Sequence, residues 1–85
     1  MDTKVVKRDG VVEDFDTNKI IRVVVAAGLD EEKAKLLSAE IADWVSKSGL
    51  PQLTSLQLRD IVIGKLHKYD ESAAKMYVWY QTTKQ

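Results

Sequence analysis

An 85-residue chain is long enough to build one small hydrophobic core, so we expect a single domain over residues 1–85. Thirteen basic and thirteen acidic side chains cancel, which leaves no overall field that would attract nucleic acid or a membrane surface. The lack of cysteine excludes disulfides, thiolate catalysis and cysteine-based zinc sites. No apolar run reaches the length of a membrane span or forms the core of a signal peptide, so a cytoplasmic location is expected.

The start of the chain predicts a β-hairpin followed by a helix. Residues 4–8 and 11–14 are short runs suited to paired strands, and they flank Asp9-Gly10. This dipeptide favours a type I′ turn, in which both central residues have positive φ. Asp16 then offers an N-cap where the periodicity changes from two to 3.6.

The first helix is predicted over about residues 17–27. Three consecutive valines would also fit a strand there, but the cap at Asp16 and Gly28 at the other end favour a helix. Because few positions in this segment are polar, we expect the helix to be buried on more than one face.

Three more helices and a short strand follow. Asp30-Glu31-Glu32 opens the second helix, Gly49 ends it, and Gln52-Leu53 reads as a third strand. A capping box formed by Thr54 and Gln57 opens the third helix, and Asp70 caps the last. The apolar stripes of these three helices are predicted at Ala34, Leu37, Ile41, Trp44 and Val45; at Leu58, Ile61, Val62, Leu66 and Tyr69; and at Ala73, Met76, Tyr77 and Tyr80. A hairpin followed by four helices implies an α+β domain in which a small sheet is laid over the helices.

The predicted hairpin and first helix bring cationic side chains together, and such a cluster suits a polyphosphate. Lys7 and Arg8 lie on the hairpin, and Lys19 and Arg22 lie on the first turns of the helix. On residue type alone, the hairpin pair also fits a charged edge strand, and the helix pair fits an ordinary solvated face. There is no Walker-type glycine loop, so side-chain cations would have to do most of the binding.

Acidic and aromatic residues allow further interpretations. Glu13, Asp14 and Asp16 would fit a metal cluster, but turn and cap roles explain them more simply, and magnesium would arrive with a nucleotide. Trp79 is expected to point away from the stripe of the last helix, which is typical of an interface residue.

Several segments together resemble the ATP-cone domain, a nucleotide-sensing module of ribonucleotide reductases and of their transcriptional repressor. The matching segments, in order, are Val6-Lys7-Arg8-Asp9-Gly10, then Glu13, Phe15-Asp16 and Lys19-Ile20, then Ala26-Ala27-Gly28-Leu29, then Ser55 with Leu58-Arg59-Asp60-Ile61-Val62, and Ala74 to Tyr80. The resemblance covers nearly the whole chain. It implies a four-helix bundle capped by a small mixed β-sheet made of the N-terminal hairpin and a short third strand.

The resemblance also implies a function. ATP or dATP, with Mg²⁺ carried on the nucleotide, would bind beneath the hairpin, and the nucleotide state would reach a partner through changes in oligomeric or domain contacts. By this resemblance, Lys7 and Arg8 would contact the phosphates, and Glu13 and Asp16 would line the site. Lys19 would contact phosphate or ribose, and Ile20 would pack against adenine. Arg59 and Ser55 would lie near the triphosphate.

Other functions remain as alternatives. A cone-fold protein-interaction module that has lost nucleotide binding is one. Direct nucleic-acid binding is disfavoured by the neutral charge, and an enzyme by the lack of a nucleophile–base pair or glycine loop. We expect a non-enzymatic regulatory domain, either standalone or part of a larger protein such as a ribonucleotide reductase. Its partner would be a host catalytic or DNA-binding domain, or a second copy, and not a membrane.

Overall fold

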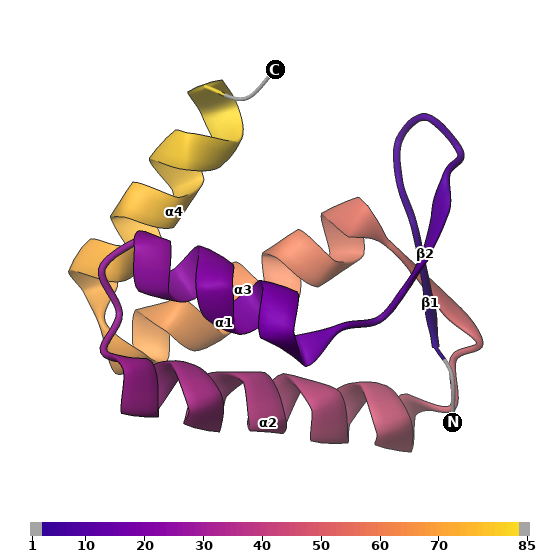
Figure 1. The fold of residues 1–85 in the computed structure, drawn as a ribbon, viewed down its shortest axis with the longest axis horizontal. Coiled ribbons are helices and arrows are strands. Elements are labelled where there is room, and N and C mark those ends of the chain that lie inside the picture. Colours follow the sequence, from indigo (N-terminus) through magenta and orange to yellow (C-terminus); the bar gives the residue numbers. More distant parts are fainter. Residues whose placement is uncertain (1–2, 84–85) are drawn as a thin grey trace.

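Four helices and a three-stranded mixed sheet make up the fold (Figure 1). The computed structural model describes residues 3–83, with side chains described as far as residue 80. The elements are β1 (Lys4–Val6), β2 (Val12–Asp14), α1 (Thr17–Ala26), α2 (Glu31–Ser48), β3 (Gln52–Thr54), α3 (Ser55–Tyr69) and α4 (Glu71–Thr83). The α+β class and the mixed sheet are confirmed, whereas a four-helix bundle stays a prediction.

The sheet places β1 in the middle, with β2 antiparallel on one side and β3 parallel on the other. Val5 pairs with Glu13 on β2 and with Leu53 on β3. Directly paired residues share one face of a sheet, and Val5 and Leu53 are buried. Glu13 therefore extends from the face of the sheet that packs against the helices.

The hairpin turn differs from the predicted type I′. The Lys7 amide donates to the Val11 carbonyl at 2.8 Å, and the Gly10 amide donates to the Lys7 carbonyl at 2.9 Å, which makes a three-residue loop. Gly10 has φ of 88°, while Asp9 does not have positive φ. A three-residue loop needs only one residue in the left-handed region, and glycine adopts it without steric cost. The Asp9 carboxylate instead accepts from the Val11 amide at 3.1 Å.

Helix α1 begins as predicted, but it buries only one face. Asp16 is the N-cap and accepts a hydrogen bond from the Asn18 amide at 2.9 Å. Ile20 and Val24 are buried, whereas Val23 and Val25 are each 40% exposed. The prediction of burial on several faces was wrong, because so small a protein has too few elements to cover a helix on every side.

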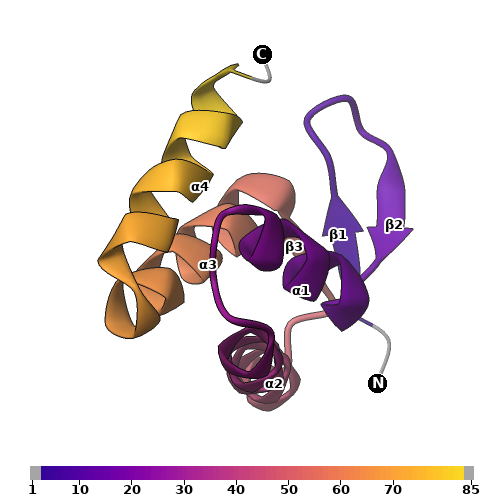
Figure 2. The ribbon, with the colours of Figure 1, turned by 60° about the vertical axis from the view of Figure 1, so that its left-hand side comes forward.

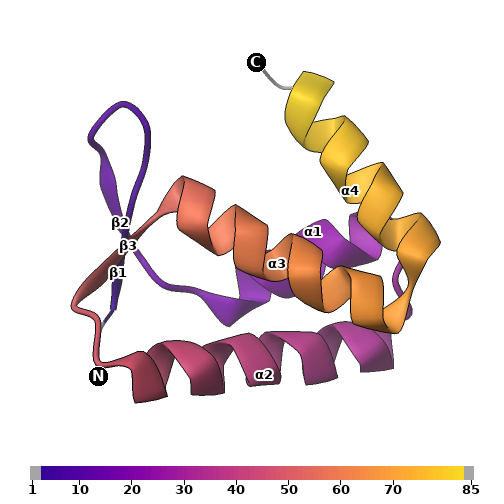
Figure 3. The same cartoon turned by 180° about the vertical axis from the view of Figure 1, so that it is seen from behind.

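The other three helices complete the core. Helix α2 lies beneath α1 and α3, and α4 packs on α3 and rises away from the rest towards its end (Figures 1 and 3). The capping box of Thr54 and Gln57 and the cap at Asp70 are confirmed. No helix in the described part of the chain is long and apolar enough to cross a bilayer. The buried core residues of the helices, β3 and the connection between α1 and α2 are Ile20, Val24, Ala27, Leu29, Ala34, Leu37, Ile41, Val45, Leu53, Val62, Leu66, Ala73, Ala74 and Tyr77.

Three predicted stripe residues lie outside the core. Trp44 is 46% exposed, because Ile41 and Val45 fill the inward face near the end of α2. Met76 and Tyr80 are also exposed. Met76 lies in the first half of α4 and faces away from the core beside the buried Tyr77, whereas Tyr80 lies towards the end of α4, which extends away from the other helices (Figure 1). Trp79 is exposed, as predicted.

Polar contacts to Glu40 join α2 to α3. Lys65 Nζ lies 3.1 Å from Glu40 Oε1, and the Tyr69 hydroxyl donates to the other carboxylate oxygen. The hydrogen bond from Tyr69, followed by that from Lys65, lowers the pKa of Glu40, and the same hydrogen bond raises the pKa of Tyr69. These contacts align α3, one wall of the candidate site, on α2.

Substitutions at two glycines should change stability in opposite directions. Gly10→Ala places a side chain at φ of 88° and should destabilise the fold by about 1–2 kcal/mol. Gly64→Ala lies inside α3 with no atom within 4 Å of the added Cβ, so it should stabilise by about 1 kcal/mol. Thermal denaturation should show melting temperatures displaced by roughly 4–8 °C per kcal/mol. Equal effects of the two substitutions would contradict the hairpin geometry.

The Glu40 contacts should appear in the pH dependence of stability. Because the pKa of Glu40 in the folded protein is lower than its ordinary value of 4.5, the ionised carboxylate stabilises the fold at pH values above 4.5. This contribution is lost as the pH falls through the pKa of the folded state. The raised pKa of Tyr69 adds stability that is lost as the pH rises through that value. In Tyr69→Phe, urea unfolding should therefore show a shallower loss of stability below about pH 5. Parallel curves for the two proteins would show that the hydrogen bond contributes nothing.

Candidate functional site

A cavity of about 320 Å³ opens between the hairpin, α1, α3 and α4. Figure 2 shows the hairpin and α4 rising on either side of α1. The residues that line the cavity are Val5, Lys7, Glu13, Lys19, Ile20, Val23, Ser55, Leu58, Arg59, Val62 and Tyr77. Its volume is at the lower end of the range for small-molecule sites.

Two of the predicted lysines meet on one carboxylate at the hairpin side of the cavity. Glu13 Oε2 lies 3.1 Å from Lys19 Nζ and 3.4 Å from Lys7 Nζ. The hydrogen bond from Lys19, together with the charges of both lysines, lowers the pKa of Glu13. Both ammonium groups are about half exposed, so they remain accessible to a ligand. The expected convergence of the hairpin with the first helix is therefore present for this pair.

Helix α3 supplies the opposite wall with a third cation. Arg59 lines the cavity, and its Nε is buried without a hydrogen-bond partner among the described residues. Ser55 stands one turn earlier, at the start of the same helix. Three cationic side chains and one carboxylate line the cavity, which leaves a formal excess of two positive charges. A buried donor without an acceptor favours an anionic ligand.

The rest of the cavity wall is apolar. Val5, Ile20, Val23, Leu58 and Val62 come from the sheet, α1 and α3 and form a hydrophobic surface between the charged groups. Ligand sites typically combine such a surface with a few convergent polar groups. The arrangement therefore suits a ligand that has both an apolar ring and several negative charges.

Three predicted site residues lie elsewhere. Arg8 lines a neighbouring hollow of about 340 Å³ with Lys7, Asp9 and Ser55. Because Lys7 and Ser55 also line the main cavity, the two hollows adjoin. Arg22 is exposed on α1 and is not among the residues that line the cavity.

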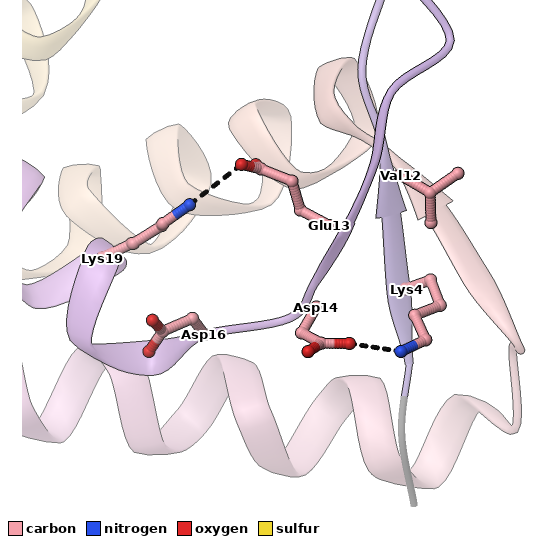
Figure 4. Close-up of a pocket in the computed structure, with 6 residues that line it drawn as sticks. All are labelled: Lys4, Val12, Glu13, Asp14, Asp16 and Lys19. Atoms are coloured by element: carbon pink, nitrogen blue, oxygen red, sulfur yellow. Dashed lines mark hydrogen bonds and ion pairs between the residues drawn. The ribbon is translucent and has the colours of Figure 1, made fainter.

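Asp16 belongs to a pocket on the outer side of the hairpin (Figure 4). This pocket of about 440 Å³ is lined by Lys4, Val12, Glu13, Asp14, Asp16 and Lys19. Its three carboxylates outnumber its two ammonium groups, and Lys4 pairs with Asp14 and lowers the pKa of that carboxyl. The outer pocket is therefore unsuited to an anion. Among the side chains that the structure describes, no group of three metal-ligating residues is positioned to hold an ion.

Tyr77 was predicted in the core stripe of the last helix, but this residue also lines the cavity. It comes from α4 and is 6% exposed. Its predicted burial was correct. The signal in the sequence for its position at the cavity is the polar hydroxyl group at a buried position. Val5, Val23, Leu58 and Val62 were likewise not expected at the site.

Comparisons with known proteins identify the family and relatives of this chain. The family model of the ATP cone domain matches residues 3–85. Transcriptional repressor NrdR of Mycobacterium leprae is 37% identical over 73 residues, which are 81% of this chain and 47% of the repressor. NrdR of Dictyoglomus thermophilum is 36% identical over 73 residues, with 81% and 49% covered. The chain spans about half the length of these curated relatives.

A family model that matches residues 3–85 leaves almost no part of the chain outside the family. The chain belongs to the ATP-cone domain family.

Proposed function

We propose that this chain is a regulatory domain that binds ATP or dATP in the cavity between the hairpin and α1, α3 and α4. The observation that carries the proposal is the meeting of Lys7, Lys19 and Arg59 around an apolar wall. A nucleoside triphosphate needs cations from several elements, because charge-assisted hydrogen bonds are the strong ones. It also needs an apolar surface for its base.

The cavity suggests a position for each part of the nucleotide. The phosphates lie against Lys7, Lys19, Arg59 and Ser55, and the adjoining hollow lets Arg8 reach the end of the chain of phosphates. Adenine packs on the apolar wall around Ile20.

Magnesium fits the site as an ion carried on the nucleotide. Among the residues that line the cavity, the one carboxylate is Glu13, and two lysines already engage it. Mg²⁺ commonly combines one or two carboxylates with phosphate oxygens, so the nucleotide would have to supply most of its ligands.

The binding would serve regulation. The matched NrdR proteins are transcriptional repressors and about twice as long as this chain. A domain of this kind would report the nucleotide state to a DNA-binding or catalytic host domain, or to a second copy, in the cytoplasm. Contact with DNA would then belong to the host and not to residues 1–85, which we propose form a single domain.

One observation favours a second candidate, a protein-interaction module without nucleotide binding. Met76, Trp79 and Tyr80 on α4 line an exposed apolar groove together with Ser72 and Lys75. Exposed aromatic residues of this kind commonly anchor interfaces. Nucleotide titration separates the two candidates, because only the first requires a ligand in the cavity.

ATP should protect the protein against heat. A ligand at one hundred times its dissociation constant adds about 2.7 kcal/mol, so millimolar ATP with Mg²⁺ should raise the melting temperature by about 10 °C or more if the affinity is tens of micromolar. Parallel titrations with dATP would measure the preference between the two nucleotides. No shift with any adenine nucleotide would favour the interaction module.

Lys7→Ala should remove most of this protection while the fold remains intact. A charge-assisted hydrogen bond contributes about 1.5–3 kcal/mol, whereas the exposed ion pair with Glu13 contributes little to stability. Lys47→Ala is the matched control, because Lys47 also forms an exposed ion pair, with Asp43 on α2, away from the cavity. Equal ATP protection of both variants and the unaltered protein would refute the phosphate position.

Glu13→Gln should strengthen the binding of inorganic tripolyphosphate. The substitution removes the negative charge that pairs with Lys7 and Lys19 and leaves both ammonium groups to the ligand. For such exposed pairs we expect about a two- to fivefold gain by calorimetry at low salt, fading as salt is added. Asp43→Asn, which removes the matching carboxylate on α2, should have no effect. Weaker binding by Glu13→Gln would mean that Glu13 orders the lysines more than it competes for them.

A further inference from the structure

Tyr77 is a buried residue that brings a hydroxyl group to the α4 side of the cavity. The residue is 6% exposed and lines the same cavity as Arg59. None of the described residues hydrogen-bonds its hydroxyl group or the buried Nε of Arg59. Buried polar groups are nearly always paired in folded proteins, so the unpartnered Nε of Arg59 points to an acceptor that the described residues do not supply. Tyr77 lines the same cavity and has a hydroxyl that could donate to the same acceptor.

The electrostatics of this wall make Tyr77 a donor. Burial raises the pKa of the Tyr77 phenol, and the positive charge of Arg59 offsets this only in part. The hydroxyl therefore keeps its proton at neutral pH and can donate to an oxyanion. Arg59 and Tyr77 line the same cavity, so one ligand group can contact both.

The two sides of the cavity differ in how far their charges are already neutralised. On the hairpin side, Glu13 pairs with both Lys7 and Lys19. On the helical side, Arg59 and Tyr77 face no carboxylate among the cavity-lining residues, since Glu13 is the one acidic residue there and pairs with the lysines. An anionic group entering the cavity gains most where no carboxylate of the protein has to be displaced.

We propose that Tyr77 is a further ligand-binding residue, whose hydroxyl donates a hydrogen bond to the phosphate group that Arg59 holds. This inference rests on the proposed function and adds a contact from α4 to a site otherwise built by the hairpin, α1 and α3. The contact also gives a reason for tyrosine at a buried position that phenylalanine would fill equally well.

Tyr77→Phe tests the inference because it removes only the hydroxyl. Calorimetry with ATP, inorganic tripolyphosphate and adenosine should show about tenfold weaker binding of the first two and unchanged binding of adenosine. The melting temperature without ligand should not fall, because no described group loses a hydrogen-bond partner. Tyr80→Phe, on the exposed side of α4, is the matched control and should leave all three affinities unchanged.

The outcomes separate this inference from the proposed function. If the unaltered protein binds ATP and Tyr77→Phe binds it equally well, the inference is overturned and the proposed function stands. An equal loss for adenosine would overturn it too, because the hydroxyl would then contact the base or the ribose. If tripolyphosphate binds and ATP does not, the proposed function fails, and the tripolyphosphate affinities still decide the role of Tyr77. Binding of neither ligand overturns both.

Discussion

The double ion pair of Glu13 connects the hairpin with α1 at the rim of the cavity and places both lysines there. Glu13 lies on β2, Lys7 follows β1, and Lys19 lies on the first turns of α1, so one carboxylate joins three segments. A two-stranded hairpin has little stability of its own, and β3 with the helices must support it. The register that pairs Glu13 with Val5 directs this carboxylate towards the helices, and the same register brings both lysines to the rim of the cavity.

Local charge matters more here than total charge. The chain is formally neutral, yet the cavity has an excess of two positive charges and the outer pocket an excess of carboxylates. The two pockets share Glu13 and Lys19 and differ in what surrounds them. Arg59 adds a cation on the inner side, while Asp14 and Asp16 add anions on the outer side. The hairpin thus separates a surface suited to phosphate from one that repels it.

Sequence patterns predicted the parts of this fold that depend on local chemistry. The caps at Asp16, Thr54 and Asp70 were correct because a cap is a contact between residues two or three positions apart. The predictions of burial that were wrong depended on tertiary packing. Val23 and Trp44 are exposed because no other element covers them. Of the site, the convergence of Lys7 and Lys19 could be predicted from the hairpin and the helix cap. The position of Arg22 outside the cavity and of Tyr77 at its wall depends on helix rotation, which periodicity gives only roughly.

Helix α4 joins the cavity to the surface. Its inner face buries Ala73, Ala74 and Tyr77, and its outer face carries Met76, Trp79 and Tyr80 in an exposed groove. Two of these three buried residues are alanines, so Tyr77 is the large buried side chain by which α4 packs beside the cavity. Under the proposed contact, a ligand would touch the same helix that carries the outward aromatic residues. Within the proposed function, α4 is therefore the element through which a bound nucleotide would influence contacts with a partner.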